Sequence, residues 1–168
     1  MEKMLISDAE VVNEFITTIP VATSEKNGLK PASDVKMERR IQTTVSRVVY
    51  EMNTKTAIST SLLISIAAFG AGPMTLFYMT INRQSDSLKA PTIILNRIGG
   101  ANAPTTPRFK VWSDESTGAF KIFFERTQYT PAIYAKILNT ISPSTDVIPL
   151  SAANQDEVDA ATYIDVTQ

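Results

Sequence analysis

A chain of 168 residues with 43% hydrophobic content is long enough for one domain with a real core and a short appendage. Its formal net charge of −1 favours neither nucleic acid nor an anionic membrane surface as a partner. The absence of Cys and His excludes disulfides, thiolate metal sites and the usual Ser-His and Cys-His hydrolases. The first residues carry acids early and lack a long apolar stretch, so we expect no signal peptide.

A short amphipathic helix is predicted within residues 1–19. Ser7 and Glu10 have the spacing of a capping box, and an apolar stripe follows, formed by Val11, Val12, Phe15 and Ile16. Such a helix is too short to be stable alone, so its stripe should pack on another surface. That surface is either the chain's own β domain or a larger body to which the chain is anchored.

A second short helix is expected after the turn-rich loop of residues 20–32. Ser33 is its expected N-cap, and the helix runs from Asp34 to about Ile41. Asp34 lies in the first turn and two arginines lie in the last turn, which are the charge signs that the helix dipole favours.

Residues 57–79 carry no charge over the length of a membrane span, but their pattern is that of strands. Leu62 and the isoleucines from Ile58 to Ile66 share one parity, while the serines of this stretch share the other, which is a period of 2. A Gly- and Pro-containing break then separates this run from a second one, in which Phe77, Met79 and Ile81 share a face. We therefore expect two strands here and no membrane insertion.

The rest of the chain predicts a mainly β fold. Further strands are expected over residues 44–52, 91–98, 108–113, 119–126, 133–140, 145–150 and 162–166. This number of short strands favours an antiparallel β-sandwich of jelly-roll-like form. We expect residues 1–42 to form an anchor or collar with short helices, and residues 43–168 to form the β-sandwich head domain.

The segment VATSEKNGLKPASDVKM, residues 21–37, resembles a run found before the terminal domain of tailed-bacteriophage fibre and baseplate proteins. Its matching positions are Ala22, Thr23, Gly28, Leu29, Ser33, Asp34 and Lys36. Lys30 departs from the apolar residue that is usual there. The order of the following strands, including the hairpin around residues 108–126, is similar to the distal head domains of such fibres.

This resemblance implies a homotrimer in which the collars of three chains meet on an axis. The collar residues near that axis would be Leu29, Val35, Met37 and Ile41. From the residues alone they are only apolar positions flanking a short helix, and packing within one chain is the alternative.

No residue pattern in the chain indicates catalysis. Asp114 and Glu115, with Glu125 across the hairpin, would have to lie about 5–10 Å apart in a cleft to hydrolyse a glycosidic bond. They fall in or near a turn, where solvated acids are usual. The acids at Asp146 and in residues 156–159 do not have the spacing of an EF-hand loop. We expect no enzymatic activity, no cofactor and no bound metal.

Trp112 is the residue most expected to contact a neighbouring subunit or a receptor. It alternates with Phe109 and Val111, so it should face away from the core of its sheet. Packing within the chain is the alternative for this side chain too.

Together, the residues and the resemblance predict a non-enzymatic virion structural protein. It would be a trimeric tail-tip or head fibre or spike, made in the bacterial host cytoplasm, that binds a host surface glycan or protein. Residues 1–42 would join it to other virion proteins. The alternatives are a carbohydrate-binding module and a fragment of a phage depolymerase.

Overall fold

The computed structural model describes residues 37–67, 74–100, 107–126, 131–141 and 148–167. The chain divides into two compact units, residues 1–36 and residues 37–168, and the described residues all belong to the second. The expected boundary between residues 42 and 43 therefore falls inside the second unit. The Ser7 helix, Leu29 and Val35 lie outside the described residues.

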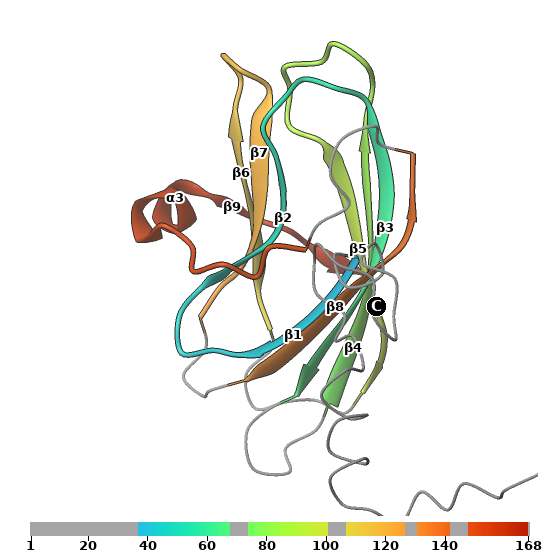
Figure 1. Ribbon diagram of the computed structural model, residues 1–168, viewed down its shortest axis with the longest axis vertical. Coiled ribbons are helices and arrows are strands. Elements are labelled where there is room, and N and C mark those ends of the chain that lie inside the picture. Colours follow the sequence, from blue (N-terminus) through green and yellow to red (C-terminus); the bar gives the residue numbers. More distant parts are fainter. Residues whose placement is uncertain (1–36, 68–73, 101–106, 127–130, 142–147, 168) are drawn as a thin grey trace, which may run out of the picture. The chain divides into compact units, whose positions relative to one another are not determined.

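The second unit is mainly β and its strands form two sheets, with a β-sandwich-like character (Figure 1). The larger sheet has six strands in the order β1-β8-β3-β4-β5-β10, and the smaller has four in the order β2-β7-β6-β9. In chain order the elements are β1 (Glu38–Gln42), β2 (Arg47–Met52), β3 (Ile58–Ala67), β4 (Met74–Arg83), β5 (Thr92–Gly100), β6 (Phe109–Asp114), β7 (Ala119–Phe124), β8 (Ala132–Thr140), helix α3 (Gln155–Ala160), β9 (Thr162–Tyr163) and β10 (Val166–Thr167).

The two long strands predicted from the period-2 pattern are confirmed. β3 and β4 pair as antiparallel neighbours over ten residues each, from Ile58 opposite Arg83 to Ala67 opposite Met74. Leu62 and Ile64 of β3 are fully buried, whereas Leu63 between them is only half-buried. The alternation exists because one face of this sheet lies on the core and the other does not.

Aromatic and branched side chains from both sheets fill the core between them. Phe77 of the six-stranded sheet meets Phe109 of the four-stranded sheet edge to face, with 5.4 Å between the ring centroids. Phe109 also contacts Phe124 on the neighbouring strand at 5.8 Å. These rings have no solvent exposure, so they bury a large apolar area where the two sheets face each other.

The helix predicted to run to Ile41 is wrong for its last four residues, which belong to β1. Glu38–Gln42 pairs with β8 in antiparallel register, from Glu38 opposite Lys136 to Gln42 opposite Ala132. Pairing along β8 satisfies the backbone groups of these residues and packs Ile41, partly buried, against the core. These tertiary gains exceed the weak local preference for a helix.

A short helix near the carboxyl end was not expected from the sequence. Asn154 caps α3 and accepts a hydrogen bond from the backbone N–H of Asp156 at 3.0 Å. Its acids Asp156 and Glu157 lie in the first turn, where the helix dipole favours them. Figure 1 shows α3 on the outer side of the four-stranded sheet, beside β6 and β7.

Candidate functional site: the loop end of the sandwich

Three connections meet at one end of the sandwich, at the top of Figure 1. They are residues 53–57 between β2 and β3, residues 84–91 between β4 and β5, and residues 115–118 between β6 and β7. We call these three connections the loop end. Because loops displayed by a rigid sheet are the usual place for binding residues, this end is the candidate functional site.

Arg83, the last residue of β4, bonds through its guanidinium group to the β2–β3 and β6–β7 connections. Nη1 donates a hydrogen bond to the backbone carbonyl of Gly118, and Nη2 donates to the carbonyls of Thr54 and Thr56, the latter at 3.2 Å. Nη2 also lies 3.4 Å from the sulfur of Met52. A planar group with several donors in fixed directions suits this bridging role, because one side chain satisfies carbonyls from two separate loops.

Arg83 is more deeply buried than is usual for a cationic side chain. The residue is 7% exposed, and its guanidinium carbon lies 5.1 Å from the centroid of the Phe120 ring. Burial lowers the pKa of Arg83 from its ordinary value. Within the described part of the chain its Nε has no hydrogen-bond partner. The charge is thus held by backbone carbonyl dipoles and an aromatic face, which fixes the side chain firmly.

The β6–β7 turn is organised by the carboxylate of Asp114. One oxygen accepts hydrogen bonds from the backbone N–H and the hydroxyl of Ser116, at 2.9 and 2.7 Å. The other accepts from the hydroxyl of Thr117 at 2.8 Å. These bonds, led by the one from the Ser116 hydroxyl, lower the pKa of Asp114. The acid therefore has a structural part in shaping this turn.

Gly118 allows the turn to approach the β2–β3 connection closely. Its φ is +75°, and a Cβ at this position would lie 2.8 Å from Cβ of Lys55. Lys55 in turn has its ammonium nitrogen 3.8 Å from a carboxylate oxygen of Asp86, which has a φ of 57°. Contacts therefore connect each of the three loops to another loop.

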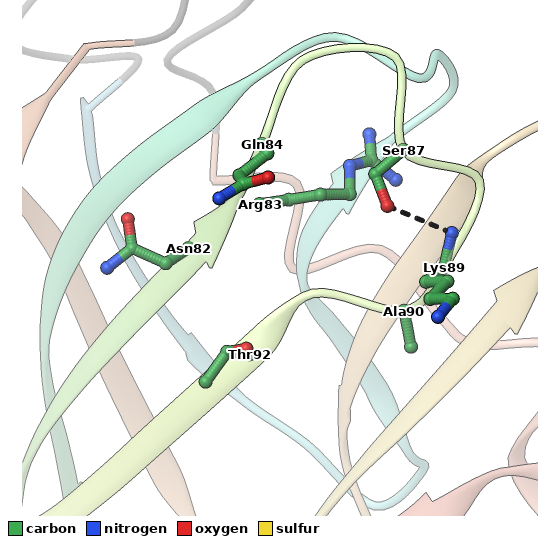
Figure 2. Close-up of a pocket in the computed structure, with 7 residues that line it drawn as sticks. All are labelled: Asn82, Arg83, Gln84, Ser87, Lys89, Ala90 and Thr92. Atoms are coloured by element: carbon green, nitrogen blue, oxygen red, sulfur yellow. Dashed lines mark hydrogen bonds between the residues drawn. The ribbon is translucent and has the colours of Figure 1, made fainter.

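A polar cleft of about 500 Å³ opens beside the β4–β5 connection (Figure 2). Its lining consists of Asn82, Arg83, Gln84, Ser87, Lys89, Ala90 and Thr92. The side chains drawn in Figure 2 include two amides, two hydroxyls and two cations, and this described lining contains no carboxylate. The backbone N–H of Lys89 donates a hydrogen bond to the hydroxyl of Ser87 at 3.3 Å, within the β4–β5 connection. Amides and hydroxyls can bind a polar ligand through hydrogen bonds.

The acids considered for glycoside hydrolysis are not brought together. Asp114 lies opposite Ala119 at the turn, whereas Glu125 comes six residues later, at the far end of the hairpin. At the rise of a strand this places them roughly 20 Å apart, which is well beyond the separation of a glycosidase pair. Glu125 is instead engaged by Arg108 at 2.7 Å and Lys110 at 3.1 Å.

Trp112 lies on the opposite face of β6 from Phe109 and Val111, as its spacing predicts. It packs against the small cluster of Val48, Phe123 and Val158, and the last of these belongs to α3. The ammonium nitrogen of Lys121 lies 5.4 Å from the Trp112 ring. The side chain is half-buried. A role at a subunit interface or in receptor contact stays a prediction.

The two described collar residues, Met37 and Ile41, also pack on the core of their own chain. They are only partly buried there, so these contacts do not test a role at a threefold axis. Ile41 lies on β1 opposite Ile133, and not on a helix as expected.

Among the described residues, no group of three or more acidic residues is placed to hold a metal ion. Asp156, Glu157 and Asp159 lie on α3, where Glu157 accepts two hydrogen bonds from Lys121, at 2.6 and 2.8 Å. Asp146 lies outside the described residues. No helix in the described ranges has the length and hydropathy of a membrane span.

Arg83 and its carbonyl partners were missed by reasoning from the sequence. The only sequence signal was the position of Arg83 along its strand. It continues the alternating series of core-facing residues Phe77, Met79 and Ile81. A cation at a core-facing position indicates a specific partner, but the pattern does not say which one. Comparisons with models of protein families, with curated proteins and with solved structures found no match for this chain.

Proposed function

We propose that this chain is a non-enzymatic structural protein of a virion, the head of a trimeric fibre or spike, whose loop end binds the surface of the host cell. The sequence support is the collar-like segment of residues 21–37 and the order of the strands after it. The structural support is the mainly β, sandwich-like character of the described residues between 37 and 167. The position on a tail tip or on the head, the trimeric state and the jelly-roll-like connectivity are parts of this proposal.

The observation that carries the proposal is the way Arg83 ties the loop end together. A receptor-binding head needs loops that are exposed and yet hold one shape, because ordering a loop on binding costs affinity. Arg83 bonds to carbonyls of two loops from the end of β4, the strand that leads into the third. The loops are thereby fixed to the sandwich while their tips stay accessible.

The cleft beside Lys89 offers a place for a surface glycan. Asn82, Gln84 and Ser87 supply amide and hydroxyl groups that match the hydroxyls of a sugar, and Lys89 adds a cation for an acidic substituent. A protein receptor would use the loop tips more broadly. The anchor, which the division of the chain limits to residues 1–36, would join the head to other virion proteins.

Electron microscopy of virions labelled with an antibody against this chain tests the proposal. The particles would be those released by cells that carry the gene. Label at the tail tip or on the head would support a virion appendage, and unlabelled particles would overturn it. Adsorption of the purified protein to host cells, compared with a Gln84→Ala and Lys89→Ala double variant, tests the binding role of the loop end.

A carbohydrate-binding module is the second candidate, and the polar cleft is the observation that favours it. Such modules are mostly monomers, so the mass in solution separates the two. A particle of 18.4 kDa would favour the module, and a particle three times heavier would favour the fibre head.

A further inference from the structure

The outer face of the six-stranded sheet carries several large apolar side chains that the described residues leave exposed. We call it the outer face and define it by the outward residues of four neighbouring strands, β8, β3, β4 and β5. Adjacent outward side chains include Leu63 opposite Tyr78 and Ser65 opposite Leu76. Thr80 lies opposite both Ser61 of β3 and Ile94 of β5. These side chains form continuous rows across the strands.

Several large side chains on this face are more exposed than core packing would allow. Ile94 is 50% exposed and Met74 is 56% exposed. Leu63, Leu76 and Tyr78 lie between them and are half-buried by their neighbours on the same face. The four-stranded sheet differs, because α3 covers its outer side and buries Val158 completely.

The outer face also lacks charge in its centre. The outward residues of β3 and β4 are Ser59, Ser61, Leu63, Ser65, Ala67, Met74, Leu76, Tyr78, Thr80 and Asn82. On the β8 side of the face, Lys136 lies opposite Leu63 and 3.5 Å from Glu38 of β1, so charge begins next to these two central strands. Depletion of charge in the centre, with aromatic and Met side chains and a charged rim, is the composition of a protein–protein interface.

The area of the outer face fits an association between protein chains. A ten-residue strand extends about 33 Å, and four strands side by side cover about 19 Å, which gives roughly 600 Å² for the flat face. A stable interface buries about 800 Å² on each partner. The projecting side chains give the face a larger accessible area than this flat estimate. The area is therefore close to that of an ordinary interface.

We infer that the outer face is the surface on which copies of this chain pack against one another. Three copies around an axis would turn this face inward, and the side chains nearest the axis would then approach their counterparts in the other copies. Like charges would repel in that arrangement, and the uncharged centre avoids this. The hydroxyls of Ser61, Ser65 and Thr80 can bond to their counterparts, since each hydroxyl both donates and accepts. The inference rests on the self-association within the proposed function and does not involve the loop end.

Sedimentation equilibrium of the full chain with Thr80→Arg tests the inference. Thr80 is central on the outer face. The guanidinium group introduced by Thr80→Arg would point outward and would lose its water only when a second copy covers the face. We expect association at least about tenfold weaker than in the wild type, with an unchanged unfolding midpoint for the separated chains. Thr162→Arg is the matched control, because Thr162 is exposed on a strand of the other sheet. It should associate like the wild type.

A second pair of variants removes bulk and adds no charge. Ile94→Ala should weaken association, whereas Leu88→Ala, at a comparably exposed residue of the β4–β5 connection, should not. This pair decides the question if Thr80→Arg does not fold. If both outer-face variants associate as tightly as the wild type, the outer face is not the association surface. The proposed trimer would then have to form through another surface. A wild type that stays at 18.4 kDa would overturn both. The loop end is not part of the outer face, so a variant that no longer associates can still be tested for adsorption to host cells.

Discussion

Arg83 and Gly118 are thirty-five residues apart in the chain and are joined by a hydrogen bond from Nη1 to the Gly118 carbonyl. The same guanidinium group bonds to carbonyls of the β2–β3 connection, so the side chain holds two loops against the end of β4. Removing it would leave the buried Gly118 carbonyl and two partly buried carbonyls without this donor, which costs more than the net value of the bonds themselves.

We therefore expect Arg83→Met to lower the free energy of unfolding by about 3 kcal/mol. Met fills much of the volume but supplies no donors. Arg83→Lys should recover only part of the loss, since a Lys ammonium cannot reproduce the planar fork. Urea denaturation measures both variants. Arg126→Met is the control, because Arg126 is exposed, and a loss of similar size there would contradict a special role for Arg83.

Gly118→Ala should destabilise the protein by about 1–3 kcal/mol. The φ of +75° disfavours any residue with a Cβ, and that Cβ would lie 3.0 Å from Cα of Lys55, which is backbone and has little freedom to move. Gly99→Ala is the control, because its Cβ would meet only Cβ of Leu76 at an ordinary 3.9 Å. Thermal unfolding of the two variants compares them directly. Equal midpoints would mean that the turn does not need glycine.

Asp114→Asn should reduce stability at neutral pH and have less effect in acid. The native pKa of Asp114 is lowered below the ordinary value of 3.8, so its carboxylate stabilises the folded state above that pH. This contribution is lost as the pH falls through the lowered native pKa, where wild type and variant should converge. Thermal midpoints measured from pH 7 downward give the comparison, with Glu115→Gln as a control for removing a neighbouring charge. A constant difference across the range would contradict the assignment.

Val158→Ala should loosen α3 and shift the fluorescence of Trp112, which is the single Trp of the chain. Val158 has no solvent exposure and belongs to the cluster that contacts Trp112. We expect a shift of the emission to longer wavelength and a loss of roughly 1–3 kcal/mol. Val45→Ala, at an exposed residue outside this cluster, should change neither quantity.

Trp112→Ala separates packing within the chain from a role between chains. Because its described contacts are with its own cluster and with Lys121, we expect a loss of about 1–3 kcal/mol, less than for a fully buried Trp. Denaturant unfolding and sedimentation of the same variant should show reduced stability with unchanged association. Unchanged stability with weakened association would instead favour the interface role predicted from the sequence.

The sequence by itself determined the strands whose burial alternates. In β3 and β4 the period of 2 decided both the element type and the face of each side chain, because one sheet face lies on a core and the other does not. The same parity placed Trp112 away from Phe109 and Val111. These predictions succeed because the information is local and repeated over many residues.

Only the tertiary structure decided how distant segments meet. Residues 38–42 carry charges that suit a helix end, yet pairing with β8, almost a hundred positions later, makes them a strand. Helix α3 had a local signal in Asn154 and Glu157, but its six residues are too few to be predicted with no surface to pack on. The bond from Arg83 to Gly118 depends on three loops arriving at one end of the sandwich. A periodic pattern fixes which face a residue occupies, whereas its partner there depends on the packing of the whole chain.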